Sequence, residues 1–123
     1  MAATLAIVAL MFAQAATGIT VEAQTQSDQV GYQALSAGRP DLAIERISAD
    51  PVSSASDPAA LINLGTAYAR SGDRTAALAR YTAALTSRER YDLELADGRW
   101  VDSRQAARLA IVMLRRGEAL ALR

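Results

Sequence analysis

The sequence has no cysteine, no histidine and no lysine among its 123 residues. Without cysteine the chain has no disulfides, thiol nucleophiles or Cys-based zinc sites, and without histidine it lacks the commonest general base. Its 13 basic residues, all Arg, are balanced by 13 acidic residues, so the formal net charge is zero. A neutral chain is a poor ligand for nucleic acid, because that binding is driven by phosphate neutralisation. We therefore expect neither a nucleic-acid partner nor cysteine- or histidine-based catalysis.

Aromatic residues are also scarce, at 5%, whereas alanine occurs 28 times. Alanine has the highest helix propensity and lets helices pack closely, so the composition favours a helical domain. A GC-rich genome would produce the same excess of Ala and Arg. The length fits one small domain.

The first residues read as an export signal. Residues 5–13 (LAIVALMFA) form an uninterrupted apolar run that is too short for a comfortable membrane-spanning helix. Two small-x-small patterns follow, Ala-Gln-Ala at 13–15 and Val-Glu-Ala at 21–23, and both fit the cleavage pattern of a secretory signal. No basic residue precedes the run, so an uncleaved anchor and a buried helix stay open as alternatives.

On the signal reading, the mature protein begins near Ala16 or Gln24 and lies in the periplasm or cell envelope. We therefore treat residues 1–23 as a signal peptide or N-terminal anchor, and residues 24–123 as a single domain.

An internal repeat appears when the sequence is shifted by 34 residues, because special residue types then coincide. The pairs are Gly31 with Gly65, Gly38 with Gly72, Ala43 with Ala77, Ile47 with Tyr81, and Val30 with Leu64. The second copy is the cleaner one and carries Leu61, Leu64, Gly65, Tyr68, Ala77, Tyr81 and Ala84.

This pattern resembles the tetratricopeptide repeat (TPR), which has a period of 34 residues. The resemblance implies two antiparallel helix pairs, with helices near residues 25–37, 40–49, 58–70 and 74–87; repeat 1 spans about 24–50 and repeat 2 about 58–90. Asp57-Pro58 is a helix-start signal. The sequence departs from the pattern at Leu61, where the family has Trp, and at Glu89, where a closing Pro is common.

After the second copy, the periodicity changes. Residues 91–101 alternate apolar and acidic side chains around Asp97-Gly98, which predicts a β-hairpin. An Asp-x-x-Gln capping box at 102–105 then opens a last amphipathic helix over about 103–116, with Gly117 expected to end it. The predicted fold class is all-α: two TPR-type helix pairs and a C-terminal capping helix, with a short hairpin inserted.

The last helix leaves two interpretations open. Either it caps the domain by folding back onto the second repeat, or its apolar residues and Trp100 form an interface for a partner or a second copy. Trp100 itself is either a packing residue or a partner-facing hot spot.

The expected function is protein binding without catalysis, with no cofactor and no metal. The family resemblance implies a concave groove that holds an extended or helical segment of another protein. The candidate partner-binding residues are Gln29, Tyr32, Asn63, Thr66, Arg70 and Trp100. Two alternatives stay open: a structural module of an oligomer or envelope complex and, more remotely, a hydrolase using carboxylates such as Asp92 and Glu94.

Overall fold

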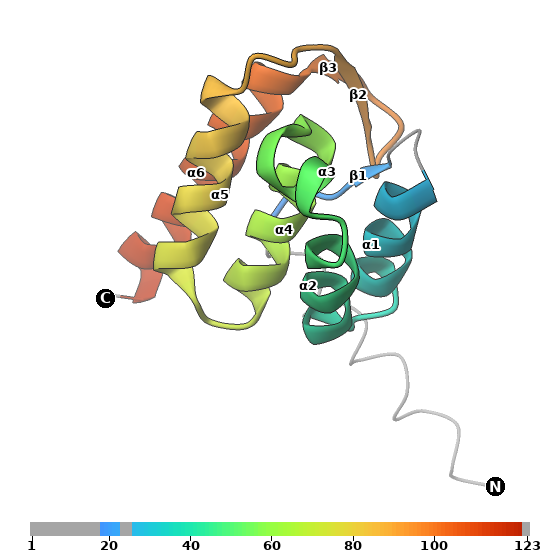
Figure 1. Cartoon of the computed structure of the whole chain (residues 1–123). Helices are drawn as coiled ribbons and strands as arrows, with labels where there is room; N and C mark the ends of the chain where they lie inside the picture. The colour runs from blue at the N-terminus through green and yellow to red at the C-terminus, as the bar shows by residue number, and fades with distance from the viewer. Residues whose placement is uncertain (1–17, 23–25, 122–123) are drawn as a thin grey trace, which may run out of the picture.

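The computed structural model describes residues 18–22 and 26–121, and over these residues the chain is mostly helical with a small antiparallel sheet (Figure 1). In chain order the elements are β1 (Val21–Glu22), α1 (Gln26–Ser36), α2 (Pro40–Ser48), α3 (Pro51–Ser56), α4 (Pro58–Arg70), α5 (Arg74–Thr86), β2 (Asp92–Leu95), β3 (Trp100–Asp102) and α6 (Ser103–Ala121).

The helices lie side by side in chain order, apart from the short α3. Helix α1 packs on α2, α4 packs on α5 and also on α2 and α1, and α6 packs on α5 and α4. The sheet, in the order β1-β2-β3, runs from the start of α6 towards α1 (Figure 1). The mostly helical character confirms the coarse part of the predicted fold class.

The two helix pairs repeat the same close contact. A Cβ built on Gly31 would lie 2.6 Å from Cδ1 of Ile47, and a Cβ built on Gly65 would lie 2.6 Å from the Tyr81 ring. Both contacts join a glycine of the first helix to a large side chain of the second, and the two are 34 positions apart. The internal repeat seen in the sequence is therefore also a repeat of packing.

The first helix of each pair also ends in the same way. Gly38 and Gly72 have φ values of 72° and 87°, the left-handed conformation that glycine adopts without strain. After α4, the amide of Asp73 donates to the carbonyl of Tyr68 at 2.9 Å, and the equivalent bond after α1 is 2.8 Å long. The expected role of Gly72 as a helix terminator is confirmed.

The predicted start at Asp57-Pro58 is confirmed, because the Asp57 carboxylate accepts from the amide of Ala60 at 3.2 Å. The segment between the pairs was expected to be a linker, and that expectation is wrong. It contains α3, whose N-cap Asp50 accepts from the amides of Val52 and Ser53. Asp50-Pro51 is the same start signal as Asp57-Pro58.

The hairpin forms where the sequence places it, with Leu93 opposite Val101 and a left-handed Gly98 in the turn. Two expectations about the ends of the domain are wrong. Helix α6 does not end at Gly117 but continues to Ala121. Residues 18–22, which the sequence interpretation excluded from the domain, belong to its fold because β1 pairs with β2 and Ile19 is buried.

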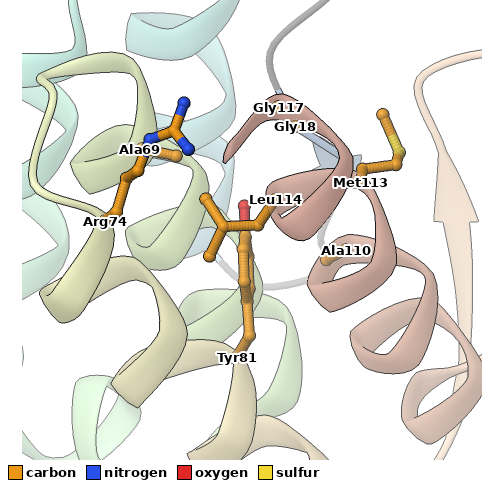
Figure 2. A pocket seen from close by; sticks show the side chains of 8 residues that line it. All are labelled: Gly18, Ala69, Arg74, Tyr81, Ala110, Met113, Leu114 and Gly117. Carbon is orange, nitrogen blue, oxygen red and sulfur yellow. The ribbon is translucent and has the colours of Figure 1, made fainter. Parts of the chain in front are cut away.

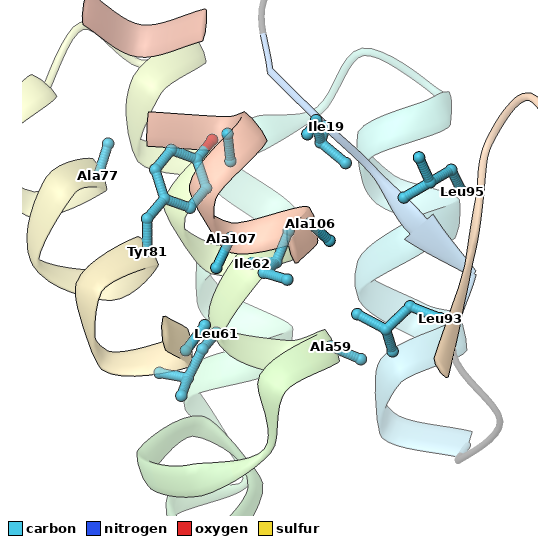
Figure 3. Close-up of a cluster of buried hydrophobic side chains, with 12 residues drawn as sticks. Ile19, Ala59, Leu61, Ile62, Ala77, Tyr81, Leu93, Leu95, Ala106 and Ala107 are labelled. Atoms are coloured by element: carbon cyan, nitrogen blue, oxygen red, sulfur yellow. The ribbon is translucent and has the colours of Figure 1, made fainter. Parts of the chain in front are cut away.

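The larger of two buried clusters joins the N-terminal segment, the second helix pair, the hairpin and α6 (Figure 3). Its members are Ile19, Ala59, Leu61, Ile62, Ala77, Tyr81, Ala84, Leu93, Leu95, Ala106, Ala107 and Ala110. Helix α6 contributes only alanines to the fully buried set, so it can approach α5 and α4 closely. The capping interpretation of this helix is therefore confirmed for its alanine face.

Candidate interaction site

The inner face of α4 is covered by an extended segment of the same chain, residues 18–22. The Thr66 hydroxyl, on α4, donates to the carbonyl of Ile19 at 2.5 Å. The amide of Ala96 donates to the carbonyl of Thr20 at 3.2 Å, and β1 pairs antiparallel with β2. The helices therefore bind an extended backbone, and the backbone that they bind is their own.

The same threonine links this segment to α5. The Tyr81 hydroxyl lies 2.8 Å from Thr66 Oγ1, and both side chains are buried. Because the single hydroxyl proton of Thr66 is directed at Ile19, the Tyr81 hydroxyl is the donor in the second bond. Burial raises the pKa of Tyr81 to about 12. The tyrosine thus stays a neutral donor at ordinary pH.

Three of the predicted binding residues lie on α4, but they do not form an open groove. Asn63 and Thr66 are 0% exposed, so the expectation that they face solvent is wrong. Arg70 is half-buried and donates from Nη1 to the carbonyl of Leu35 at 2.9 Å; desolvation lowers the pKa of its guanidinium. The cause is a contact that the sequence interpretation did not include, the docking of residues 18–22 on this face.

The other predicted residues lie elsewhere. Tyr32 is half-buried on α1, and the side chain of Gln29 lies outside the described residues. Trp100 is 57% exposed and lies opposite Glu94 across the β2–β3 pair, whereas its neighbour Val101 lies opposite the buried Leu93. This exposure favours the partner-facing interpretation of Trp100.

Two openings flank the point where Gly18 enters the fold. A cavity of about 80 Å³ is lined by Ala69, Arg74, Tyr81 and α6 residues that include Leu114 (Figure 2). A wider groove of about 350 Å³ lies between the hairpin turn and α6, and its lining includes Arg70, Leu95, Arg99, Leu109 and Met113. The sequence gave no signal for either opening, because both depend on where residues 18–22 dock.

The outward face of α6 carries an exposed stripe of mixed character, which we call the α6 stripe. Its spacing follows one helix face, and its residues are Gln105, Arg108, Leu109, Val112, Arg115 and Arg116, all exposed. Leu109 and Val112, at 37% and 44% exposure, are among the few exposed large apolar side chains. Three Arg surround them, and residues 103–117 contain no acidic residue. The stripe therefore presents apolar surface within a positive border.

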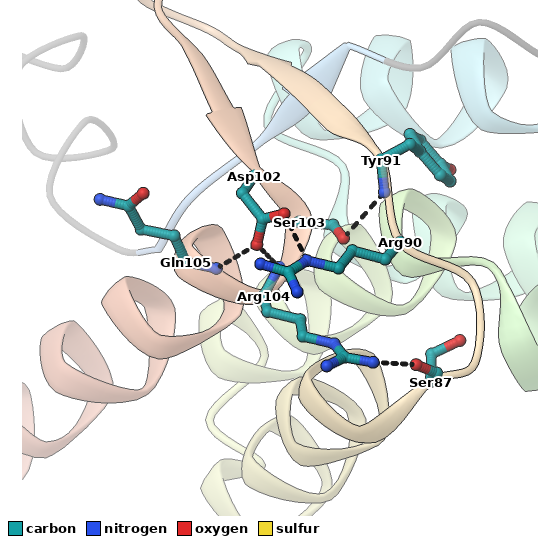
Figure 4. A network of polar contacts seen from close by, with 7 residues as sticks. All are labelled: Ser87, Arg90, Tyr91, Asp102, Ser103, Arg104 and Gln105. Carbon is teal, nitrogen blue, oxygen red and sulfur yellow. Dashed lines mark hydrogen bonds and ion pairs between the residues drawn. The ribbon is translucent and has the colours of Figure 1, made fainter.

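A polar network fixes the start of α6 (Figure 4). Asp102 accepts from Nε of Arg90 at 2.7 Å and from the amides of Arg104 and Gln105, which confirms it as the predicted helix cap. Ser103 accepts from the amide of Tyr91 at 3.3 Å. These contacts set the angle at which α6 leaves the hairpin.

The hairpin carboxyl groups give no support to the hydrolase alternative. The hydrogen bond from Arg90 lowers the pKa of Asp102, and the backbone and side chain of Arg99 lower that of Asp97. A carboxylic acid that donates a proton in glycoside hydrolysis needs the opposite shift.

Comparison with protein-family models, curated protein sequences and solved structures finds no significant match to this chain. Among the described residues, none of the helices has the combination of length and apolar character needed to cross a membrane.

Proposed function

We propose that this chain is a non-catalytic protein-binding module of the TPR type, and that the α6 stripe is the surface that it offers to a partner. The TPR assignment is supported by the 34-residue repeat of the glycine contacts and of the helix ends. The expected groove on α4 is filled by residues 18–22, so the proposal places the binding surface on α6.

The observation that carries the proposal is the exposure of Leu109 and Val112 within an arginine border. Exposed apolar surface bordered by polar groups marks interaction sites on small domains. Arginine on such a surface favours a partner with carboxylates, since its guanidinium binds them in a forked geometry. The partner is thus an amphipathic helical segment whose apolar residues are flanked by Asp or Glu.

The alternative, a structural module that associates with itself, is less well supported at this surface. A two-fold pairing of two copies would bring the same patch of each together. Arg108, Arg115 and Arg116 of one copy would then face the positive border of the other, and like charges across an interface are unfavourable. Charge complementarity therefore favours a foreign acidic partner over a second copy.

A synthetic peptide tests the proposal. We expect a labelled amphipathic helical peptide with leucines flanked by glutamates to bind the full chain saturably in fluorescence anisotropy, with an affinity that falls as salt rises. A peptide with lysines in place of the glutamates should not bind. Absence of saturable binding by the acidic peptide, or a preference for anionic lipid vesicles over it, contradicts the proposal.

A double variant locates the site. Leu109→Ser with Val112→Ser should weaken peptide binding at least tenfold, because it removes the apolar centre of the stripe. Leu78→Ser is the matched control, since Leu78 on α5 is also 37% exposed but lies outside the stripe. Equal losses in both proteins would mean that the peptide binds apolar surface without regard to site.

We also propose that the protein is exported to the periplasm or cell envelope, on the basis of the apolar run at residues 5–13 and the small-x-small patterns after it. Fractionation of cells that produce the full chain tests this. Recovery only from the cytosol, with Met1 intact, contradicts it.

A further inference from the structure

The two small-x-small patterns are equivalent in the sequence but not in the fold. Cleavage after Ala15 would leave Gly18–Glu22 in the mature protein, whereas cleavage after Ala23 would remove them. Gly18, the first described residue, lies three positions after Ala15. The question is whether the domain is complete without these five residues.

The core needs this segment. Ile19 is 7% exposed and belongs to the same buried cluster as Leu93 and Leu95 of the hairpin. Its removal would expose the side of Leu93 and Leu95 that faces it (Figure 3). Burying these apolar side chains again would require the hairpin to move, because a hairpin is only marginally stable unless it packs on something.

The hydrogen bonds need it too. Without residues 18–22, the buried Thr66 hydroxyl loses the Ile19 carbonyl as its acceptor, and the amide of Ala96 loses the carbonyl of Thr20. Strand β2 also loses its partner β1, which pairs through Val21 with Leu95. Cleavage after Ala23 would thus cost buried polar partners as well as apolar contacts.

We infer that the chain is processed between Ala15 and Ala16 by a protease of the signal-peptidase class, and that residues 16–22 remain as the first part of the mature domain. This inference rests on the export proposal. The step is a hydrolysis: water adds across the Ala15–Ala16 peptide bond, Ala15 ends in a carboxylate, and Ala16 carries the new amino group. The second small-x-small pattern then lies within the mature chain, partly in β1, and is not a processing site.

The test uses the full chain in exporting bacterial cells, with N-terminal sequencing and intact mass of the protein that accumulates. The wild type should begin at Ala16. Ala15→Arg should lose that product, because arginine replaces the small residue before the cleaved bond. Ala23→Arg is the matched control and should still begin at Ala16.

The outcomes separate the two proposals. A wild-type protein beginning at Gln24, with processing blocked by Ala23→Arg and not by Ala15→Arg, overturns the inference but leaves export standing. An intact Met1 in the cytosol overturns both. An intact Met1 in a membrane fraction overturns the cleavage and makes the first residues an anchor.

Discussion

Gly65 on α4 lies against the ring of Tyr81 on α5, so closely that a Cβ at Gly65 would be 2.6 Å from two ring carbons and 3.2 Å from the Ala77 carbonyl. The ring has little room to move, since Tyr81 is 1% exposed and its hydroxyl is hydrogen-bonded to Thr66. The approach of the two helices is thus set by the absence of a side chain at one position.

Gly65→Ala should therefore destabilise the protein, although alanine is the better helix former. We expect a net loss of about 1–2 kcal/mol in the free energy of unfolding, since overpacking costs more than helix propensity returns. Urea unfolding followed by circular dichroism measures it. The same change at Gly31, which meets Ile47 in the same way, should act in the same direction.

The control for this prediction is Gly117→Ala in α6. There a Cβ would be 3.6 Å from Nη2 of Arg74, an ordinary contact. We expect a gain of about 0.5–1 kcal/mol from helix propensity alone. If Gly65→Ala stabilises the protein as much as Gly117→Ala does, the close helix contact is wrong.

The hydroxyl of Thr66 should matter more than its methyl group. Thr66→Val leaves the Tyr81 hydroxyl and the Ile19 carbonyl without their shared partner, at a cost of about 1–3 kcal/mol. Thr66→Ser keeps the hydroxyl and loses one methyl group, which costs about 1 kcal/mol. Hydrogen exchange gives a second readout, since the Ala96 amide, which donates to Thr20, should exchange faster in Thr66→Val than in Thr66→Ser. Equal exchange rates would show that Thr66 does not hold the segment.

Stability should also fall at alkaline pH because of Tyr81. Its folded-state pKa of about 12 lies above the unfolded value of about 10, so the folded state holds the proton more tightly. The resulting stabilisation is complete below pH 10 and is lost as the pH rises through 12; two pKa units correspond to about 2–3 kcal/mol. Urea midpoints between pH 8 and 12 measure it, and Tyr81→Phe should show a shallower decline than the wild type. Parallel declines in the two proteins would assign the effect to other groups.

Much of the fold was readable from residue types at fixed spacing. Gly31 and Gly65 are small where two helices touch, and Ile47 and Tyr81 are large where they fill that contact, so the 34-residue shift found both helix pairs. The helix α3 was missed although Asp50-Pro51 carries the same start signal as Asp57-Pro58, because the Ser-rich composition that follows suggested a linker.

The site was harder to predict because it depends on contacts distant in sequence. Val21 pairs with Leu95, and Ile19 accepts from Thr66; neither contact leaves a local pattern. Asn63 and Thr66 therefore looked like groove residues although the chain covers them. The α6 stripe was within reach of sequence analysis, since Arg108, Leu109 and Val112 follow helical spacing. What the spacing did not show is that Ala107 faces the core and Leu109 faces solvent.

The central claim is that the α6 stripe recognises an acidic amphipathic segment, and an exchange of charges tests it most directly. The measurement is the Kd, by fluorescence anisotropy, of the glutamate-flanked and lysine-flanked peptides for the wild type and for a triple variant with Arg108→Glu, Arg115→Glu and Arg116→Glu. The account predicts that the wild type binds only the glutamate peptide and that the variant binds only the lysine peptide, while Arg46→Glu on α2 behaves as the wild type. Loss of both peptides by a variant that remains folded, or an unchanged preference for the glutamate peptide, would contradict it.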